Sequence, residues 1–496
     1  MNLTVIPSER RRHAPTAPVL SDHLRGTITN EEFDELVATG ARFLASSGVG
    51  RGDIVAVKMS NQIELVVALF ASWRLGAALT PVNPALTPDE TLFQLQDSHA
   101  VLLITDEPVE NAPSFTTVVP VLALNQGAVN PVEVPAEPAS MEDVALVIYT
   151  SGTTGRPKGV ELVHANLDAM TASMCQALEL GSADHSLLIL PLFHVNGIVV
   201  GVLAPLRAGG RTTLAERFSS SRFFSDVDAV RPTYFSGVPA IYAMLANLPD
   251  QIQPVLSSLR FMICGAAPMP PTLIERMESR YGVPLLEGYG LSEATCAATC
   301  NRLEDVRKPG TVGRALPGVR VAISDGSGGI AITGQVGEVL IAGPTVMKGY
   351  LGRPDATTDA LQGDWLRTGD IGRLDDDGYL VLLDRAKDVI IRGGENVYPP
   401  EVESALSEHP HVIEAAVVGR PDNVLGEVPV AFVALRSGSD SAGPDLIRFL
   451  QARLAKYKVP VAVLPLDDIP KNQLGKYDKP ALRAMAGAGP PSAPHA

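Results

Sequence analysis

Cysteine, aromatic residues and excess positive charge are all scarce in this chain of 496 residues. Only four residues are cysteines (Cys175, Cys264, Cys296 and Cys300), and the last two lack the His or Cys partners of a zinc finger, so we expect buried, reduced thiols. Aromatic residues make up 5% of the chain, and the formal net charge is -15. Holding nucleic acid requires a basic surface, so this charge argues against nucleic acid as a main partner.

Long apolar runs are also missing. The stretches LVVALFASW from Leu65 and GIVVGVLAPL from Gly197 fall short of the roughly 18 to 20 residues that span a bilayer. At the N-terminus, MNLTVIPSERRRHAP places its basic run after a short apolar stretch, which is the wrong order for a secretory signal. We therefore expect no membrane span and a cytoplasmic location.

The composition is that of a globular enzyme, with 46% hydrophobic and 19% charged residues. Short apolar runs alternate with stretches of helical spacing over residues 29–47 and 63–75. This alternation is typical of α/β layers with largely parallel sheets. The predicted strands are Ile54–Lys58, Val101–Ile104, Val144–Tyr149, Leu187–Leu190 and Phe261–Cys264.

The pattern changes near Gly334, where apolar runs separated by Gly and Asp turns predict a β-rich subdomain over about residues 310–384. Beyond it, helices at 400–407 and 445–454 and strands at 412–418 and 429–435 predict a small α+β domain, residues 385–485. We thus expect a large N-terminal body, residues 1–384, this C-terminal domain, and a loose Gly/Pro/Ala-rich tail, residues 486–496.

The most informative stretch is YTSGTTGRPKGV, residues 149–160. Its glycines allow conformations closed to other residues, its hydroxyl groups add donors, and its lysine adds a cation, so it can wrap a polyphosphate. It does not fit the Walker A pattern, and in isolation it is equally typical of an ordinary Gly/Thr-rich turn. The candidate phosphate-binding residues are Thr150, Ser151, Gly152, Thr153, Thr154, Gly155 and Lys158.

Four further strings follow: EGYGLSEAT at 287–295, WLRTGDIG at 365–372, DRAKDVIIRGGENVYPPEVE at 384–403 and IPKNQLGKYDK at 469–479. With the loop, they make the chain resemble the adenylate-forming superfamily of acyl-CoA synthetases, aryl-CoA ligases, peptide-synthetase adenylation domains and luciferases, over residues 65–479. The resemblance implies an acyl-CoA synthetase. Such an enzyme converts a carboxylic acid and ATP to acyl-AMP and pyrophosphate, then transfers the acyl group to CoA and releases AMP.

The resemblance also assigns roles in adenylation. The loop holds the β- and γ-phosphates, Glu293 coordinates Mg²⁺, and Ser292, usually threonine in the family, contacts the α-phosphate. Outside their string, Ser292 and Glu293 would simply begin a helix. Lys476 reaches the active site only in the adenylating pose, although sequence alone also permits an exposed lysine.

The nucleotide-binding residues follow from the same resemblance. Tyr289 would stack on adenine, Asp370 would accept the ribose hydroxyls, and Arg385 would contact the sugar and phosphate region. The alternatives are a core aromatic for Tyr289 and plain turns for the other segments. The adenine walls comprise Gly265, Ala266, Ala267, Glu287, Gly288 and Tyr289.

Thioester formation requires a second catalytic face, so the resemblance implies a mobile C-terminal domain that rotates about Lys387. Gly393 and Gly394 would line the pantetheine tunnel, or else form an ordinary loop. His194, in PLFHVNG, would gate CoA access or orient the thiol, although a His in an apolar loop is more often structural.

Two alternative functions stay open: an acyl-AMP ligase that serves a carrier protein, and a non-catalytic nucleotide-binding relative. For the acid, small residues around Val238 and Gly290 predict a cavity for an aryl or medium alkyl group, as in fatty-acid metabolism. Malonyl-CoA synthetases of this family place an arginine near the position of Gly288, and its absence argues against a malonate-like dicarboxylate. The expected ligands are the acid, ATP, CoA and Mg²⁺, and a homodimer is compatible with this prediction.

Overall fold

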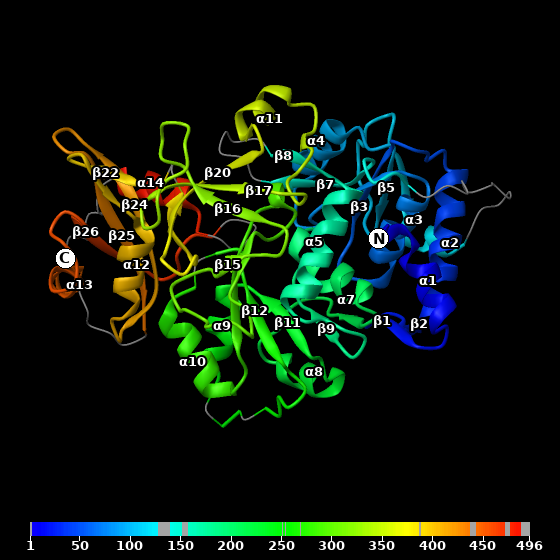
Figure 1. Ribbon diagram of the computed structural model, residues 1–496, viewed down its shortest axis with the longest axis horizontal. Coiled ribbons are helices and arrows are strands. Elements are labelled where there is room, and N and C mark those ends of the chain that lie inside the picture. Colours follow the sequence, from blue (N-terminus) through cyan, green and yellow to red (C-terminus); the bar gives the residue numbers. More distant parts are fainter. Residues whose placement is uncertain are drawn as a thin grey trace, which may run out of the picture.

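A computed structural model describes residues 2–126, 139–150, 157–249, 251–252, 254–267, 269–385, 388–436, 443–471 and 477–487. Two large sheets form most of the body (Figure 1). The first has the order β18-β8-β7-β4-β3-β5-β6 and is parallel from β7 to β6. Its strands are β18 Gly349–Tyr350, β8 Lys158–Val163, β7 Val144–Thr150, β4 Ala78–Pro81, β3 Ile54–Lys58, β5 Leu102–Thr105 and β6 Thr117–Pro120.

The second sheet has the order β15-β14-β13-β12-β11-β9-β10-β1-β2, with a parallel centre from β13 to β1 and antiparallel strands at both edges. Its strands are β15 Arg314–Ala315, β14 Thr299–Cys300, β13 Leu285–Tyr289, β12 Phe261–Cys264, β11 Tyr234–Gly237, β9 His185–Leu188, β10 Arg211–Leu214, β1 Pro18–Asp22 and β2 Gly26–Thr29. All five strands predicted in the body are present, with ends shifted by at most a few residues. The predicted α/β layers are confirmed.

Helices cover these sheets. The predicted helices are α2 Asn30–Ser46 and α3 Ile63–Arg74; Thr29 and Glu32 form a capping box that starts α2. The α3 sequence is apolar on nearly every side, and the helix is buried almost throughout. The other body helices are α1 Ile6–His13, α4 Pro88–Ser98, α5 His164–Ala177, α6 Val195–Ile198, α7 Ala204–Arg207, α8 Phe223–Val230, α9 Pro239–Ala246, α10 Pro271–Tyr281 and α11 Pro354–Ala360, with short turns at Leu3–Val5, Val121–Asn125 and Ser292–Ala294 and a π-helical segment at Val199–Leu203.

A third, antiparallel sheet follows, as predicted from the change of pattern near Gly334. It comprises β16 Arg320–Ile323, β17 Gly337–Ala342, β20 Trp365–Leu374, β19 Leu361–Gln362 and β21 Leu380–Arg385. Val339, Ile341 and Leu366 belong to the same hydrophobic core as the two large sheets. This sheet is therefore part of the body.

The C-terminal segment forms a separate α+β layer at one end of the molecule (orange to red in Figure 1). Its cores lie on both sides of the sheet and contain residues from Ile390 onward, so they share no residue with the core of the body. This distribution supports, as a proposal, a junction near residue 385. The elements are β22 Ile390–Arg392, β23 Glu395–Val397, β24 Val412–Asp422, β25 Gly426–Leu435, β26 Ala462–Leu466, α12 Pro399–Ser407, α13 Gly443–Gln451 and α14 Lys479–Gly487.

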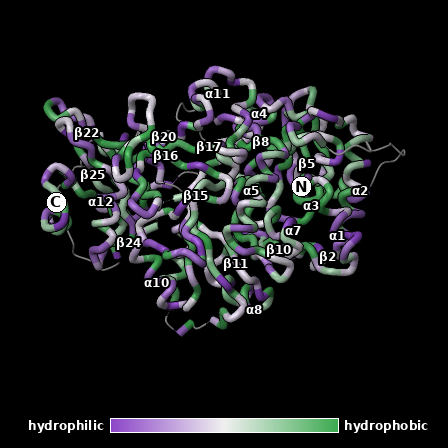
Figure 2. The backbone as a smooth tube through the Cα atoms, in the orientation of Figure 1, coloured by the Kyte–Doolittle hydropathy of each residue, from purple (hydrophilic) through white to green (hydrophobic). Residues whose placement is uncertain are grey.

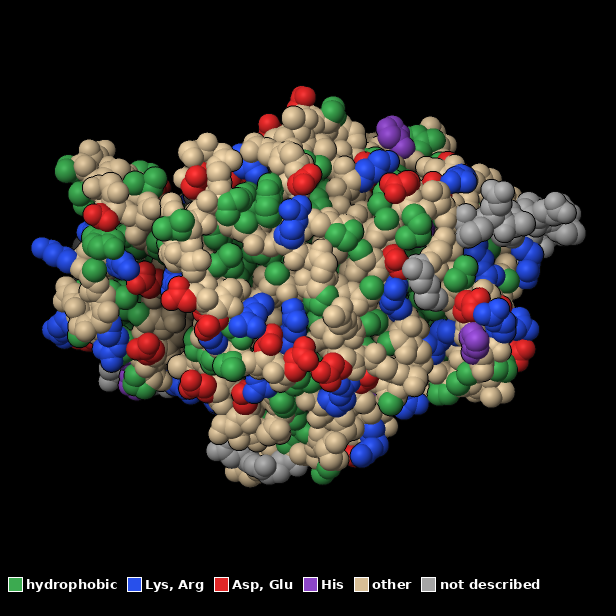
Figure 3. Space-filling view, in the orientation of Figure 1, with side chains coloured by type: hydrophobic (Ala, Val, Ile, Leu, Met, Phe, Trp, Pro, Cys, Tyr) green, Lys and Arg blue, Asp and Glu red, His purple; other side chains and the backbone are tan. Residues whose placement is uncertain are grey.

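The surface and the core separate as expected for a globular protein. Hydrophilic residues colour much of α1 and α10 in Figure 2, and Figure 3 shows Lys and Arg side chains interspersed with Asp and Glu on the face in view.

Within the described ranges, no helix combines the length and the apolar character needed to cross a membrane. Cys264 and Cys300 are buried as predicted, whereas Cys175 and Cys296 are only half-buried; all four are free thiols.

Candidate functional site

Three neighbouring parallel strands end at one edge of the second sheet. The register of β11, β12 and β13 places Gly237, Cys264 and Glu287 side by side. The next residues of each strand therefore meet at this edge, among them Val238, which is half-buried at the start of α9. The carboxyl ends of parallel strands are where α/β proteins place ligands. The sequence motifs that resemble nucleotide-binding walls thus converge on an edge suited to a ligand.

Gly288 and Gly290 are held by close backbone packing. A Cβ atom at Gly290 would lie 2.1 Å from the carbonyl oxygen of Cys296 and 2.4 Å from Cα of Ala297. At Gly288, a Cβ atom would lie 3.1 Å from the carbonyl oxygen of Thr299 on β14. Any side chain at these positions requires the neighbouring backbone to move. The absence of side chains lets the segments Cys296–Ala297 and Thr299 pack closely against this edge of the sheet.

The wall at Gly265, Ala266 and Ala267 is supported from behind by a buried carboxylate. Ala266 has a left-handed φ of 70°, which is uncommon outside glycine, and Ala266 and Ala267 are exposed. Below them, Oε1 of Glu287 accepts a hydrogen bond of 3.1 Å from the backbone N–H of Met269. Burial raises the pKa of Glu287 to about 7, and its Oε2 has no hydrogen-bond partner among the described residues. Glu287 therefore holds the turn that forms the wall.

Tyr289, Asp370 and Arg385 form one connected group. The Tyr289 hydroxyl donates to Oδ2 of Asp370 over 2.6 Å. On the other carboxylate oxygen, Nε of Arg385 lies 3.0 Å from Oδ1, and β20 and β21 place these two residues opposite each other. The backbone N–H of Asp370 donates to Oγ1 of Thr368. The three residues predicted for ribose, base and phosphate contact are therefore brought together, with Asp370 only 6% exposed.

Ser292 and Glu293 lie in a short 3₁₀ turn, Ser292–Ala294, and begin no longer helix. Both are half-buried. The carbonyl oxygen of Glu293 accepts from the backbone N–H of Met347, and its carboxylate Oε1 accepts a 2.9 Å hydrogen bond from the hydroxyl of Tyr350. The turn is thus fixed through both its backbone and its side chain.

The phosphate-loop string is the connection of an antiparallel hairpin. Thr150 ends β7, Lys158 begins β8, and the two residues are paired in register. The ammonium of Lys158 lies 5.0 Å from the ring centroid of Tyr350. The hairpin therefore directs the cation of the loop toward the residue that contacts Glu293. Seven predicted site residues lie outside the described residues: Ser151, Gly152, Thr153, Thr154, Gly155, Lys387 and Lys476.

The donors near Glu293 fit Mg²⁺. Across the described ranges, no cluster of three or more His, Cys, Asp or Glu side chains could cage a metal ion. Mg²⁺ bound with nucleotides commonly takes one or two carboxylates and completes its shell with phosphate oxygens and water. Glu293 supplies one such carboxylate, and its side chain is oriented by the hydrogen bond from the Tyr350 hydroxyl.

His194 stands at the start of a helix with a π-helical interruption. Its backbone N–H donates to the carbonyl oxygen of Pro191, and its ring packs on Phe193 with a centroid distance of 4.5 Å. The side chain is half-buried. The helix after it runs through α6 and the π-helical segment Val199–Leu203 into α7, and such bulges are frequent at functional sites. Its predicted role in gating or orienting CoA remains a prediction.

Gly393 and Gly394 form the two-residue turn between β22 and β23. Their φ angles are 61° and 90°, and the flanking residues Arg392 and Glu395 pair across the hairpin. Both positive φ values match the preference of such turns for glycine. The glycines are exposed, so the turn geometry already explains them, and their contact with pantetheine stays a prediction.

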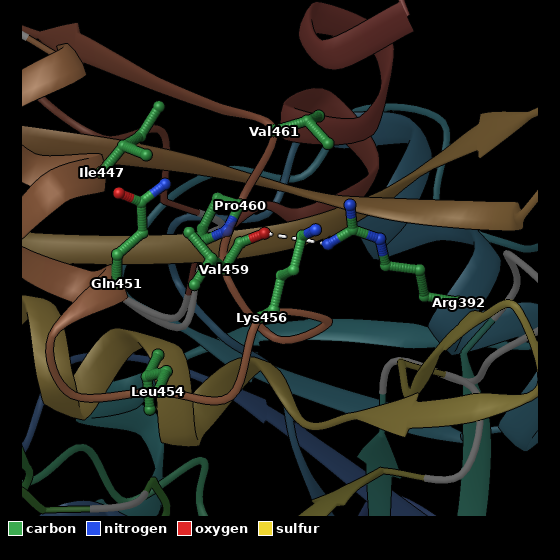
Figure 4. Close-up of a pocket in the computed structure, with 8 residues that line it drawn as sticks. All are labelled: Arg392, Ile447, Gln451, Leu454, Lys456, Val459, Pro460 and Val461. Carbon is green, nitrogen blue, oxygen red and sulfur yellow. Dashed lines mark hydrogen bonds between the residues drawn. The ribbon is translucent and has the colours of Figure 1, made fainter.

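A cavity of about 420 Å³ lies beside this hairpin (Figure 4). The guanidinium of Arg392 donates to the carbonyl oxygens of Tyr457 at 2.8 Å and Val459 at 3.0 Å, which fixes the loop that borders the cavity. Both Arg392 and Lys456 line it, so its wall carries two cations. The other lining residues are Ile447, Gln451, Leu454, Val459, Pro460 and Val461.

Sequence reasoning missed Tyr350 and the charged residues near it. Tyr149, the first residue of the loop string, donates to Oδ2 of Asp97 on α4 over 2.9 Å, and Asp97 pairs with Arg353 at 2.5 Å. These contacts join segments that are far apart in the chain, and no spacing within one motif indicates them. The tyrosine in KGYLGR is the one local signal, and it carries no chemistry until Glu293 is placed beside it.

Comparison with known proteins identifies the chain. A model described as AMP-binding enzyme matches residues 8–351, and one described as AMP-binding enzyme C-terminal domain matches residues 401–476. The chain belongs to the AMP-binding enzyme family. This AMP-binding enzyme is 37% identical over 487 residues to the feruloyl-CoA synthase of an Amycolatopsis species, covering 97% of the chain and 98% of the relative. It is 38% identical over 491 residues to the 2-succinylbenzoate–CoA ligase of Geobacillus kaustophilus (strain HTA426), covering 97% and 98%.

Solved structures of related enzymes support the same family assignment. The o-succinylbenzoate CoA synthetase of Bacillus subtilis in complex with the acyl-adenylate intermediate OSB-AMP superposes with a TM-score of 0.89 at 32% identity, covering 96% of this chain and 97% of the other. The same enzyme is also solved with ATP and a magnesium ion, with a TM-score of 0.88. This AMP-binding enzyme is accordingly an AMP-forming acid–thiol ligase, an acyl-CoA synthetase, with ATP and CoA as substrates and Mg²⁺ as cofactor.

Proposed function

We propose that Lys158, Ser292 and Glu293 form the adenylating centre of this acyl-CoA synthetase, with an aryl-substituted carboxylic acid as its substrate. The observation that carries the proposal is the convergence of Lys158 and Glu293 on Tyr350. A carboxylate and a tetra-anionic triphosphate repel each other, so their reaction requires nearby cations and fixed geometry. In this proposal the loop cation is Lys158, the metal-binding carboxylate is Glu293, and both contact the side chain of Tyr350.

In the first half-reaction, a carboxylate oxygen of the acid attacks the α-phosphorus of ATP, and the bond to pyrophosphate breaks. Lys158 and the hydroxyls of the loop from Thr150 neutralise the leaving phosphates, and the Ser292 hydroxyl donates to the α-phosphate. When bound at Glu293, Mg²⁺ supplies charge neutralisation at the phosphate oxygens. Lys476 stabilises the charge that develops between the two reactants.

The nucleotide occupies the strand edge. Asp370 accepts the ribose hydroxyls in this proposal, with Arg385 beside it and Tyr289 against the base. The Tyr289–Asp370 hydrogen bond and the Asp370–Arg385 ion pair support this assignment, because they orient the carboxylate before the nucleotide arrives. The wall from Gly265 to Ala267, held by Glu287, faces the base.

In the second half-reaction, the thiolate of CoA attacks the carbonyl carbon of the acyl-adenylate, and AMP leaves with the bonding electron pair. We propose that the C-terminal domain rotates about Lys387 for this step, that pantetheine passes Gly393 and Gly394, and that His194 orients the thiol. The cavity beside the hairpin then suits the phosphate-bearing end of CoA, because Arg392 and Lys456 line it.

A charge reversal tests the CoA assignment better than a change at Gly393, whose φ of 61° would strain any larger residue. Lys456→Glu should raise the KM for CoA several-fold and leave acid-dependent ATP–pyrophosphate exchange unchanged. Arg448→Glu on α13 is the matched control, because Arg448 is exposed and pairs with Asp445 outside the cavity. An unchanged KM for CoA in Lys456→Glu would remove the cavity from the proposal.

The small residues at the strand edge support an aryl acid. Gly265 leaves room beside the adenylate, because a Cβ atom there would meet only the carbonyl oxygen of Gly288, at 3.6 Å, whereas Gly288 and Gly290 are glycines because backbone packs closely against them. The feruloyl-CoA and 2-succinylbenzoate–CoA ligases among the relatives are named for aromatic acids. A panel of aryl, medium alkyl and dicarboxylic acids, scored by CoA-dependent AMP formation, tests this. The highest kcat/KM on an alkyl or dicarboxylic acid would overturn the aryl assignment.

Location and assembly complete the proposal. We expect a cytoplasmic enzyme and a homodimer. Light scattering on the purified enzyme, at twice the 52.4 kDa of one chain, would support the dimer, and a mass of one chain would contradict it.

A further inference from the structure

The backbone of Tyr350 is held in place by hydrogen bonds that do not involve its side chain. It lies in the short edge strand β18 and pairs with Val160 of β8. Its backbone N–H donates to Oγ1 of Thr357 over 2.9 Å. On either side, the backbone N–H groups of Lys348 and Leu351 donate to the strand that begins with Lys158. The tyrosine is therefore attached to the same strand as the loop lysine.

Its side chain contacts both charged groups of the proposed adenylating centre. The hydroxyl donates to Oε1 of Glu293 over 2.9 Å, and the ammonium of Lys158 lies 5.0 Å from the ring centroid. Burial, and then the carboxylate of Glu293, raises the pKa of the Tyr350 hydroxyl, so it stays protonated and remains a donor at neutral pH. The ring attracts the cation through its π face.

A second contact ties the same segment to the other strand of the hairpin. Arg353 pairs with Asp97, and Asp97 accepts the hydroxyl of Tyr149, the residue before Thr150. Residues 349–353 thus contact β8 directly and are linked to β7 through Asp97, and within this segment Tyr350 hydrogen-bonds to Glu293.

We propose that Tyr350 is a positioning residue for adenylation, which orients the Glu293 carboxylate and keeps the Lys158 ammonium on its ring face rather than on that carboxylate. The inference rests on the proposed roles of Glu293 and Lys158. A direct Lys158–Glu293 ion pair would neutralise the two charges that ATP and Mg²⁺ need. Tyr350 holds both groups in place through a neutral hydroxyl and a π system, so each keeps its charge for the ligand.

The test is Tyr350→Phe, which keeps the ring and removes only the hydroxyl. Partners behind a metal ligand typically change metal affinity by roughly 10- to 100-fold. We expect the Mg²⁺ concentration for half-maximal adenylation to rise at least about 10-fold, with a smaller change in kcat at saturating Mg²⁺. Thioester formation from a synthetic acyl-adenylate and CoA should be unchanged.

Tyr379→Phe is the matched control. Tyr379 is buried, whereas Tyr350 is half-buried, but it makes the same two kinds of contact: its hydroxyl donates to the carbonyl oxygen of Val306, and Lys308 lies 4.5 Å from its ring centroid. Neither contact involves Glu293. It should show a normal Mg²⁺ dependence. An unchanged Mg²⁺ dependence in a folded Tyr350→Phe variant, or equal losses in both half-reactions, would overturn the inference.

Glu293→Gln separates this failure from failure of the proposed function. If Glu293→Gln keeps a normal Mg²⁺ dependence, the metal-binding role of Glu293 is wrong and the role of Tyr350 falls with it. If Glu293→Gln loses the normal Mg²⁺ dependence and Tyr350→Phe keeps it, only the positioning role of Tyr350 is wrong. The double variant should lose no more Mg²⁺ affinity than Glu293→Gln alone.

Discussion

The charged side chains of the proposed adenylating centre and those at the junction of the two domains have different kinds of partner. At the site, Glu293 contacts the hydroxyl of Tyr350, and Lys158 contacts the ring of the same residue. At the junction, Asp388 is bridged directly by Lys479 at 3.3 Å and Arg483 at 2.6 Å. Glu293 and Lys158, the two groups proposed to meet Mg²⁺ and the leaving phosphates, are thus held by an uncharged partner, whereas the nucleotide-site pair Asp370–Arg385 and the junction residues Asp388, Lys479 and Arg483 are paired with opposite charges.

Two carboxylates at the junction, Asp388 and Asp384, have pKa values shifted in opposite directions. Burial would raise the pKa of Asp388, but Lys479 and Arg483 hold it below its usual value. Asp384 lies 3.7 Å from Lys479, and one of its carboxylate oxygens has no hydrogen-bond partner among the described residues; burial is the main cause that raises its pKa to about 6. Lys479 begins α14 in the C-terminal segment, and Asp384 ends the body, so their ion pair crosses the proposed junction.

The largest effect is expected from Lys476→Ala. If its ammonium stabilises charge between the attacking carboxylate and the α-phosphate, its loss should cost about 3 to 4 kcal/mol, or roughly a hundredfold to a thousandfold in adenylation. Rotation of the domain would carry it away before the thiol attacks, so transfer from a synthetic adenylate should survive. Single-turnover assays from acid plus ATP, and from adenylate plus CoA, measure the two steps. Parallel losses would contradict the division of labour, and no loss in either would make Lys476 a surface lysine.

Glu287, a buried carboxylate with no ion pair among the described residues, should make stability depend on pH. The pKa of Glu287 is raised to about 7 in the folded enzyme, so its contribution to stability is present below its unfolded value and is lost as pH rises through about 7. The loss is at most about 3 kcal/mol. Glu287→Gln should therefore gain stability relative to wild type between pH 5 and pH 8 in urea unfolding. An identical pH dependence in both proteins would show that Glu287 does not titrate in this range.

A smaller loss is expected from Asp388→Asn, which removes the charge paired with Lys479 and Arg483. Since Asp388 is buried and its partners are partly exposed, we expect a loss of about 2 kcal/mol in the free energy of unfolding. Asp377→Asn is the control, because Asp377 also pairs with a lysine but is 62% exposed, and such pairs are worth about 0.2 to 1 kcal/mol. Equal losses in the two variants would contradict the special role of the junction.

The fold and much of the site follow from the sequence because their signals are local. Strand β3 occupies the predicted Ile54–Lys58, and Tyr289, Asp370 and Arg385 meet as their motifs indicated. The contacts of Tyr350 and Asp97 join separate segments, and no local pattern encodes them. Gly393 shows a different limit, because a turn and a ligand channel both favour glycine, and the φ of 61° explains it without a ligand.

The central claim is that the group around Glu293 serves adenylation and not thioester transfer. Acid-dependent ATP–pyrophosphate exchange by Glu293→Gln, measured beside acyl-CoA formation from a synthetic acyl-adenylate, tests it most directly. We predict that exchange falls roughly a hundredfold or more, while transfer to CoA from the adenylate stays near the wild-type rate. Wild-type exchange in a folded Glu293→Gln enzyme, or an equal fall in both reactions, would contradict the account.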